Sequence, residues 1–338
     1  MPVPMTDCIT KEKIQELKAI LSGAESVAVA AHTHPDGDAL GAVTALALYL
    51  QRFMGKTVTC YLPDRAPENL NFILNPAVSY KWNPQQSIES DAIVLLDCNA
   101  FIRTEGLGAA LQNSKAPKVL IDHHLNPDSA SFNLVFSTPD ISSASELLFH
   151  VLKALGWDVK DTEIGTALLS GMTTDTNNFS NSTYPSTFEM ASELIAGGVD
   201  RDAVLTKIYQ SYRENRIRII GYMQYQGLKV YPEGAACMII TNEIKERFGV
   251  REGETEGLVN MPLAIENVKI SLLLTEQEGH FRVSLRSKKG TSAQQCAQRF
   301  FNGGGHENAA GGKLFPERDL KGETIEEYAR KALLEVLK

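Results

Sequence analysis

The stretch Val119-Leu120-Ile121-Asp122-His123-His124 decides how this sequence is interpreted. An apolar run that breaks into an acid and two imidazoles is typical of a buried strand whose C-terminal end carries chemistry. Two earlier runs repeat the pattern, because residues 27–31 precede His32 and residues 93–96 precede Asp97. In open α/β sheets, ligands bind beyond the carboxyl ends of the strands. The three runs therefore predict one shared site along one edge of a sheet.

The residues around these runs alternate between helix and strand patterns. Apolar residues at helical spacing predict a helix over 10–22, and dense small and apolar residues predict another over 39–49. Ser143 with Glu146 resembles a capping box that opens a further helix. The alternation predicts an α/β fold whose mainly parallel sheet has helices on both faces.

The 338 residues are enough for two domains of ordinary size. A charged helical region covers residues 201–228, and new strand patterns follow at 235–240, 270–274 and 281–285. We predict a catalytic domain over 1–190, a helical connector over 191–230 and a smaller α/β substrate-binding domain over 231–338, across a cleft from the first.

Composition narrows the class of protein. A formal net charge of −8 argues against binding to long nucleic acid, whose affinity comes mostly from phosphate neutralisation. The sequence contains no run of 18 consecutive apolar residues, so no membrane span is predicted. Residues 1–10 lack the pattern of a secretory signal. The five cysteines are odd in number and form no CxxC pair. Reduced thiols in a cytoplasmic protein are therefore expected.

Residues of metal-binding type are grouped along the chain. One aspartate alone is usually a cap or a turn residue, and one histidine alone is usually a satisfied polar side chain. Carboxylates that converge without a cation repel one another, so a group indicates ligands. Mixed carboxylate and imidazole ligands suit Mn²⁺, Zn²⁺ or Fe²⁺, and pairs of metal ions recur in phosphate-ester hydrolysis. The grouped residues, at predicted strand ends or beside glycine-rich turns, are His32, Asp36, Asp38, Asp97, His123 and Asp175.

A basic segment stands out in the second half of this acidic chain. Strand alternation predicts that Arg282, Arg286 and Lys288 share one face. Downstream, a turn at residues 303–305 precedes His306 and would expose backbone N–H groups that can cradle an anion. We expect these residues to bind one end of a substrate. An ordinary solvated strand and an ordinary turn are the alternatives.

These motifs, in this order, resemble those of the DHH phosphoesterases: His32-x-x-Pro35-Asp36-Gly37-Asp38, Asp97, Asp122-His123-His124 and Thr174-Asp175. The segments Arg286-Ser287 and Gly303-Gly304-Gly305-His306-x-x-Ala309-Ala310-Gly311 resemble the DHH-associated C-terminal domain. The resemblance covers essentially the whole chain and is greatest to the stand-alone nano-RNase and pAp phosphatase branch. Asn302, where a fourth glycine is expected, and Cys98-Asn99 depart from the pattern without touching a proposed ligand.

The resemblance implies two divalent metal ions, most readily Mn²⁺, one held by His32, Asp36 and Asp97 and one by Asp38, Asp97, His123 and Asp175. Asp97 would bridge the ions, and water or hydroxide between them would be the nucleophile.

The remaining site residues would lie around the metal ions or bind the substrate. Asp122 would orient an imidazole. His124 would contact substrate phosphate or support a metal ligand, and a simply packed histidine is the alternative. Arg103 could reach the site or form a structural ion pair. Arg286, Ser287, Gly303, Gly304, Gly305 and His306 would bind substrate.

The predicted activity is hydrolysis of short 5′-phosphorylated oligoribonucleotides to mononucleotides, together with dephosphorylation of pAp. A cyclic- or linear-dinucleotide phosphodiesterase is the alternative within the class, and a non-catalytic nucleotide-binding regulator is the alternative outside it. All six proposed ligands are present, which favours an enzyme over the regulator. A homodimer is an option that the sequence leaves open.

Overall fold

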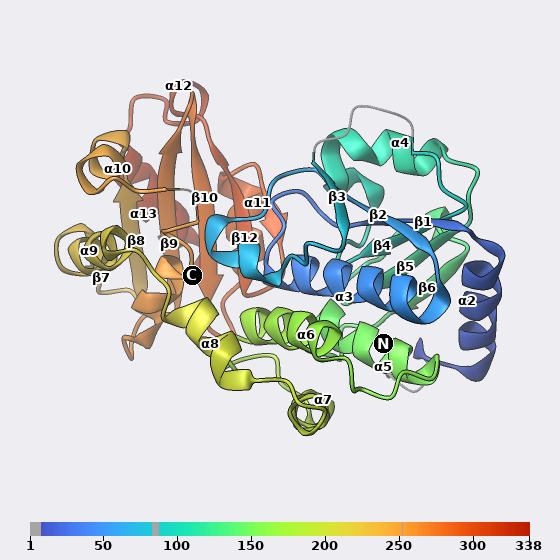
Figure 1. Cartoon of the computed structure of the whole chain (residues 1–338). Helices are drawn as coiled ribbons and strands as arrows, with labels where there is room; N and C mark the ends of the chain where they lie inside the picture. Colours follow the sequence, from blue (N-terminus) through green and yellow to red (C-terminus); the bar gives the residue numbers. More distant parts are fainter. Residues whose placement is uncertain (1–7, 83–87, 252) are drawn as a thin grey trace. The chain divides into compact units, whose positions relative to one another are not determined.

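A computed structural model describes residues 8–82, 88–251 and 253–338. Most of the N-terminal stretch without a signal pattern, residues 1–7, lies outside the described residues. The chain forms two compact units, Met1–Ser211 and Tyr212–Lys338 (Figure 1). They divide within the region 191–230 in which the sequence predicts a connector. In the described ranges, no helix has both the length and the apolar character that crossing a bilayer requires.

The first unit is built on a six-stranded sheet in the order β3-β2-β1-β4-β5-β6. Every neighbouring pair of strands is parallel, which confirms the predicted sheet. The strands are β1 (Ser26–Ala30), β2 (Thr57–Leu62), β3 (Ser79–Trp82), β4 (Ala92–Leu96), β5 (Lys118–Asp122) and β6 (Leu134–Ser137).

Helices cover both faces of this sheet (Figure 1). On one face, Val27 and Val29 of β1 pack in a core with a group of six helices that begins with α2 and α3. On the other face, Ala28 and Ala30 pack in a second core with η2 and α4. This is the period-2 alternation of a strand that is buried on both sides. The first group is α2 (Lys11–Gly23), α3 (Gly37–Met54), α5 (Ala144–Ala154), α6 (Thr162–Asp175), α7 (Pro185–Ala196) and α8 (Arg201–Tyr209). The other face has η2 (Phe101–Leu107) and α4 (Gly108–Asn113), and short turns lie at η1 (Glu68–Ile73) and η3 (Ser129–Ser131).

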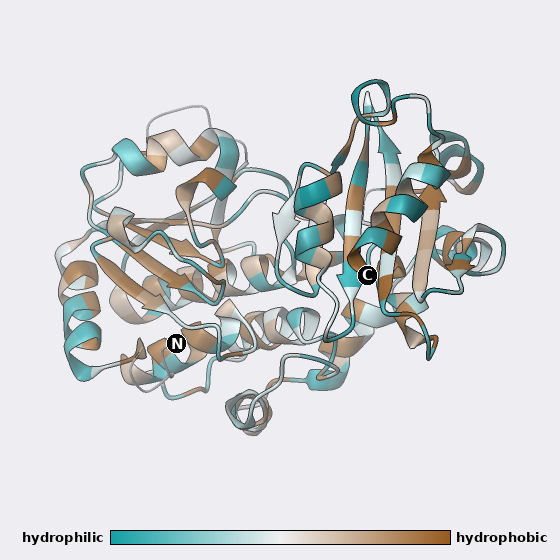
Figure 2. Cartoon of the chain, turned by 180° about the vertical axis from the view of Figure 1, so that it is seen from behind, coloured by the Kyte–Doolittle hydropathy of each residue, from teal (hydrophilic) through white to brown (hydrophobic). Residues whose placement is uncertain are grey.

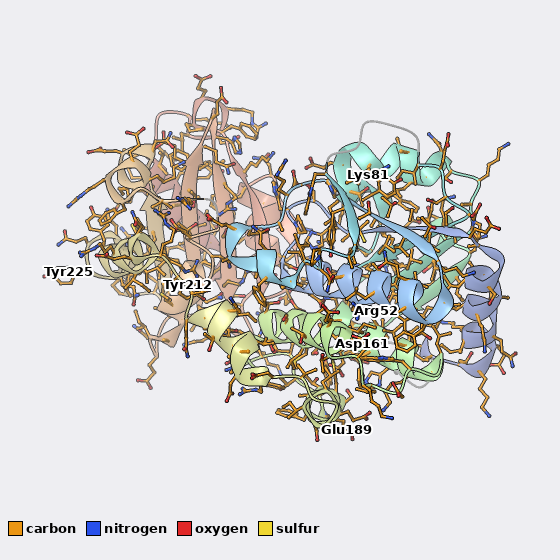
Figure 3. The ribbon with its side chains drawn as sticks, in the orientation of Figure 1. Arg52, Lys81, Asp161, Glu189, Tyr212 and Tyr225 are labelled. Carbon is orange, nitrogen blue, oxygen red and sulfur yellow. The ribbon has the colours of Figure 1, made fainter. Side chains whose placement is uncertain are left out.

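Helices α3 and α6 pack unusually closely. A Cβ atom on Gly41 would lie 2.5 Å from the carbonyl oxygen of Ala167 and 3.0 Å from Gly171 Cα. At the far end of α3, the Arg52 guanidinium donates two hydrogen bonds to Asp161 (2.9 and 2.7 Å) at the start of α6 (Figure 3). The pair holds together two helices that each carry site residues.

We expect Gly41→Ala to destabilise the first unit. Alanine gains about 1 kcal/mol of helix propensity. Its methyl group meets backbone atoms that cannot rotate away, and overpacking of this kind typically costs roughly 1–3 kcal/mol. The expected result is a melting temperature lower by a few degrees in a thermal scan. Gly23→Ala is the control because nothing lies within 4 Å of its added Cβ atom. An equal or higher melting temperature for Gly41→Ala would show that the helices can separate freely.

The second unit has a mixed six-stranded sheet in the order β11-β12-β10-β9-β8-β7. One face packs on α11 and α13, and part of the other packs on α9, η4 and η5. Hydrophobic and hydrophilic bands alternate along strands of this sheet (Figure 2). The elements are α9 (Glu214–Tyr222), η4 (Met223–Gly227), β7 (Lys229–Tyr231), β8 (Ala235–Ile240), α10 (Asn242–Phe248), η5 (Leu258–Ala264), β9 (Ile270–Gln277), β10 (His280–Ser287), α11 (Ala293–Phe300), β11 (Gly304–Gly305), β12 (Ala309–Leu314), α12 (Pro316–Asp319) and α13 (Ile325–Val336).

The predicted capping box at α5 is only half formed. The Ser143 hydroxyl accepts a hydrogen bond from the Glu146 N–H (3.0 Å), as expected. The Glu146 carboxylate does not return to Ser143. It accepts hydrogen bonds from the backbone and hydroxyl of Ser142 and from Thr187 of α7. A tertiary contact therefore replaces the local one.

Candidate active site

The first half of the site joins the ends of β1 and β4 to the start of α3. The His32 Nε2 atom lies 3.4 Å from Asp97 Oδ2 and 3.9 Å from Asp36 Oδ1. Asp36 is the N-cap of α3, and its Oδ1 atom accepts hydrogen bonds from the N–H groups of Asp38 and Ala39. His32 Nδ1 lies 2.7 Å from the Thr33 carbonyl oxygen, so the proton of the neutral ring belongs on Nδ1 and Nε2 is the nitrogen that faces the carboxylates.

The second half centres on His123, directly after β5. Its Nε2 atom lies 3.4 Å from Asp97 Oδ1, 3.6 Å from Asp175 Oδ2 and 3.9 Å from Asp38 Oδ2. The two oxygens of Asp97 therefore face different imidazoles, His32 and His123. Asp97 adopts a left-handed backbone conformation (φ 50°), which Asp tolerates better than most residues. The three strand ends named by the sequence thus meet at one edge.

Helices, not strand ends, position Asp38 and Asp175. Asp38 is buried in the first turn of α3, and its carboxylate accepts the N–H groups of Ala144 (2.6 Å) and Ser145 (2.9 Å) at the start of α5. Asp175 is the last residue of α6, so the end of a helix positions it, and neither a strand end nor a glycine-rich turn does.

Gly37 allows a close approach between α3 and α6. It lies inside α3, and a Cβ atom there would be 2.2 Å from Thr174 Oγ1. Glycine is therefore required because Thr174 of α6 approaches closely, not because a tight loop must turn. The close contact brings the segment of Asp36 and Asp38 against the segment of Asp175.

The crowded charges shift several pKa values. Burial, followed by repulsion from Asp97 and Asp175, raises the pKa of Asp38 well above its ordinary value. Burial also raises the pKa of Asp175, to about 7. Burial opposes the charged form of His32, but hydrogen bonding to Asp97 and the charges of Asp97 and Asp36 outweigh it and raise the pKa of His32 to about 9. For Asp38 and Asp175, the nearby imidazoles therefore offset burial and the repulsion between carboxylates only in part.

The residues present fit a divalent metal ion. Ligand atoms within each of three sets lie within 4.8 Å of one another, and the Oδ1 atom of Asp97 is buried without a hydrogen-bond partner in the described part of the chain. Such an orphaned oxygen is costly unless a cation or water satisfies it. The sets are His32, Asp36 and Asp97; Asp38, His123 and Asp175; and Asp97, His123 and His124.

Asp122 orients His124 and not His123. The carboxylate of Asp122 is fully buried, lies 2.7 Å from His124 Nδ1 and accepts the His124 N–H (3.1 Å). With Nδ1 held by Asp122, the His124 ring has Nε2 as its remaining polar atom. This arrangement suits a substrate contact better than ligation through Nδ1.

Two further residues hold the loops of the site, and neither was predicted from the sequence to do so. Asp64 accepts hydrogen bonds from the Thr33 hydroxyl and the His34 N–H (2.8 Å), which anchors the loop after β1. The Asn99 amide donates to the Leu125 carbonyl (2.9 Å), and the Asn99 carbonyl accepts the Asp128 N–H (2.8 Å). Asp64 could have been found, because it closely follows the apolar run of β2.

Arg103 lies near the site through its backbone. Its carbonyl oxygen accepts the Thr33 N–H (2.9 Å), which ties η2 to the loop after β1. Its side chain is half-buried and, within the described ranges, forms no ion pair with a carboxylate. The structural ion pair considered from the sequence is therefore not found there.

In the second unit, the structure separates residues that the sequence grouped. Arg286 is half-buried on the β10 face that carries Arg282. Ser287 is buried on the opposite face, where its hydroxyl donates to the Thr291 carbonyl (2.6 Å). Lys288 lies beyond the strand and donates to the carbonyls of Ile265 and Glu266, so its predicted place beside Arg282 is wrong.

The glycine-rich segment is paired rather than open. The Gly303 N–H donates to Ala297 O (3.2 Å), so this group is not exposed to an anion as predicted. The next N–H after the glycines, that of His306, donates to Ala309 O (2.8 Å). A Cβ atom on Gly303 would lie 1.9 Å from Gly311 O, whereas one on Gly304 would meet nothing within 4 Å. Glycine at 303 thus allows β11 to pair with β12. At Gly304 the backbone is uncovered, because no other atom lies near the position of a Cβ atom.

Comparison with known families agrees with this fold and site. Residues 26–174 match the model of the DHH family N-terminal domain, and residues 236–331 match that of the DHHA1 domain. The chain belongs to the DHH family of phosphoesterases.

Individual relatives cover nearly the whole chain. The bifunctional oligoribonuclease and PAP phosphatase NrnA of Thermus thermophilus is 29% identical over 90% of this chain and 89% of its own length. The crystal structure of an exopolyphosphatase-related protein from Bacteroides fragilis is 32% identical, with a TM-score of 0.89, and covers 98% of this chain and 97% of that one. The cyclic-di-AMP phosphodiesterase PdeA of Listeria monocytogenes is 24% identical over 88% of this chain, but over only 46% of its own length.

Proposed function

We propose that this protein is a two-metal phosphohydrolase that cleaves short 5′-phosphorylated oligoribonucleotides to mononucleotides and removes the 3′-phosphate of pAp. The observation that carries the proposal is the position of Asp97, whose two oxygens each face a separate group of imidazole and carboxylate ligands. A relative of nearly equal length named for these two activities supports the choice of substrate.

His32, Asp36 and Asp97 would hold one ion, and Asp38, Asp97, His123 and Asp175 the other. Oxygen and nitrogen donors of this kind suit Mn²⁺. When bound, the pair of ions would supply a Lewis acid for the phosphoryl oxygens and a nucleophile active at neutral pH.

The protein's own residues would orient this site. The first turn of α5 donates two N–H groups to Asp38 and so fixes its carboxylate plane. Asp122 holds His124 in one orientation, in which Nε2 would face a substrate phosphate. In the second unit, Arg286 and His306 would bind the phosphate at the other end of the substrate, beside the bare backbone at Gly304. Arg103 would add a positive charge close to the loop after β1.

A cyclic-dinucleotide phosphodiesterase remains the second candidate, because the Listeria relative has that name.

We place the enzyme in the cytoplasm, where reduced thiols are the rule. Its five cysteines are all buried and unpaired, which agrees with that compartment.

A substrate panel tests the proposal. The purified protein with Mn²⁺ is assayed on pAp, on 5′-phosphorylated di- and trinucleotides, on cyclic di-AMP and on pyrophosphate. We expect the highest kcat/KM on the linear nucleotides and on pAp, with mononucleotides as products. Preference for cyclic di-AMP would transfer the assignment to the second candidate. Turnover of pyrophosphate alone, or of none of the panel, would overturn both.

Metal removal should destabilise the protein. Burial, and then repulsion from Asp97 and Asp175, raises the pKa of Asp38, and cations would relieve both effects. A ligand that binds only the folded state stabilises it by about 2.7 kcal/mol at a hundredfold excess over Kd. We therefore expect chelation to lower the melting temperature and Mn²⁺ to restore it in a thermal-shift assay. If the melting temperature is the same with chelator and with Mn²⁺, the cluster does not bind metal.

A further inference from the structure

Glu146 is a fully buried carboxylate that the proposed chemistry does not use. It lies in the first turn of α5 and has no exposed surface. Burying a carboxylate is costly unless hydrogen bonds compensate for the lost water. An acid at this position of a helix usually completes a capping box, but Glu146 serves the residue before the cap instead. Its burial therefore calls for a role beyond capping its own helix.

The hydrogen bonds of Glu146 join the segment before α5 to the start of α7. Its Oε2 atom accepts the Ser142 N–H (3.2 Å), the Ser142 hydroxyl and the Thr187 hydroxyl (2.8 Å). Thr187 in turn accepts the Tyr184 N–H (3.0 Å) at the N-terminus of α7. Ser142 and Thr187 are both buried. One carboxylate oxygen thus anchors the entry of the chain into α5.

The segment anchored in this way is the one that binds Asp38. The N–H groups of Ala144 and Ser145 donate to the Asp38 carboxylate (2.6 and 2.9 Å), and the Ser145 hydroxyl lies 3.4 Å from the Asp38 carbonyl oxygen. A Cβ atom on Gly171 of α6 would lie 2.1 Å from Ser145 Oγ, so α6 packs directly against this turn. The orientation of the Asp38 carboxylate therefore depends on the turn that Glu146 anchors.

The other oxygen of Glu146 indicates that the site needs an acceptor and not a full charge. Glu146 Oε1 and His150 Nε2 are both buried, and neither atom has a hydrogen-bond partner among the residues that the structure describes. They lie 3.8 Å apart, which is beyond hydrogen-bond distance. An amide at position 146 would keep the accepting oxygen and place its nitrogen towards His150. Glu146→Gln is therefore a conservative variant that preserves the anchor.

We propose that Glu146 is a positioning residue for the metal ligand Asp38, which it holds in place through Ser142 and the first turn of α5. The inference rests on the proposed function and deepens it. Groups that orient a metal ligand typically contribute about 10- to 100-fold to metal affinity or activity. Because Glu146 is not itself a proposed ligand or substrate contact, its removal should weaken metal binding and leave the KM for substrate unchanged in saturating Mn²⁺.

The test measures Mn²⁺ binding to metal-free Glu146→Leu and Glu146→Gln by calorimetry, well below their melting temperatures. Leucine fills a similar volume but accepts no hydrogen bond, so we expect the affinity for one of the two ions to fall about 10- to 100-fold. Turnover of pAp should fall in limiting Mn²⁺ and recover in excess Mn²⁺. Glu146→Gln should bind Mn²⁺ as wild type does. If Glu146→Leu does not fold, Ser142→Ala replaces it and should weaken Mn²⁺ binding by a smaller factor.

Thr44→Val is the matched control for stability. It removes a buried hydrogen bond, between Thr44 and Tyr80 (2.8 Å), that is not connected to Asp38. This variant should melt at a lower temperature but bind Mn²⁺ with wild-type affinity.

Two results would overturn the inference alone, provided that wild type binds two ions. Wild-type Mn²⁺ affinity in folded Glu146→Leu, or in Ser142→Ala where that variant replaces it, would mean that Glu146 only stabilises the fold. Equal weakening in Glu146→Gln and Glu146→Leu would mean that the charge matters and the anchoring oxygen does not. Wild-type protein that binds no Mn²⁺ would overturn the proposed function and this role of Glu146 with it.

Discussion

Asp97→Ala is expected to lower kcat/KM on a dinucleotide by about 10³-fold or more while the protein remains folded. One oxygen of Asp97 faces His32 and the other faces His123, so a single substitution removes a ligand from both groups. A metal ion supplies several kcal/mol of transition-state stabilisation, and each 1.4 kcal/mol is tenfold in rate. The measurement is steady-state turnover in saturating Mn²⁺, with the fold checked by circular dichroism.

Asp140→Ala is the control for this variant. Asp140 is an exposed carboxylate in the loop after β6, and its removal changes the net charge by the same amount. Its activity should match that of wild type. Near-normal turnover by a well-folded Asp97→Ala protein would contradict the assignment of Asp97 to both ions.

Arg286→Ala should separate substrate binding from bond cleavage. Truncating an arginine that is hydrogen-bonded to phosphate in a closed site costs roughly 2–5 kcal/mol, which is about 30-fold or more in affinity. We expect that decrease in kcat/KM on pAp and dinucleotides. Slow hydrolysis of bis-p-nitrophenyl phosphate, a small ester that needs only the metal cluster, should barely change. His306→Ala should behave alike, because both residues are proposed to bind the same phosphate.

Lys289→Ala is the control for Arg286→Ala, since Lys289 is an exposed cation just beyond the end of β10. An equal decrease on nucleotide and generic ester in the Arg286 variant would mean that Arg286 supports the fold or the metal cluster. No decrease on either substrate would mean that Arg286 belongs to an ordinary solvated strand and does not bind phosphate.

The sequence could predict those parts of the site that follow strand ends. The apolar runs before His32, Asp97 and His123 identify neighbouring parallel strands, and parallel strands end at one edge. The same logic does not apply to Asp175, because the apolar run before it forms the helix α6 and not a strand.

Other features depend on partners far along the chain. The anchoring of Asp38 by Ala144 and Ser145 joins segments more than 100 residues apart, and no local pattern signals it. Lys288 does not lie on its predicted face because the strand ends one residue earlier, at Ser287. Its ammonium group donates instead to the backbone carbonyl of Ile265. Glycines at 303–305 predicted an open turn, but they are equally suited to the close approach of two strands, which is what the fold uses.

Titration of the metal-free enzyme with Mn²⁺ tests most directly the claim that one shared aspartate joins two metal positions. Bound metal per chain and turnover of a 5′-phosphorylated dinucleotide are measured at each addition, for wild type and for Asp97→Ala. We predict that wild-type activity rises until two ions are bound per chain, and that Asp97→Ala retains neither tight stoichiometric binding nor activity. Full activity in excess chelator, or full activity with a single bound ion, would contradict the account.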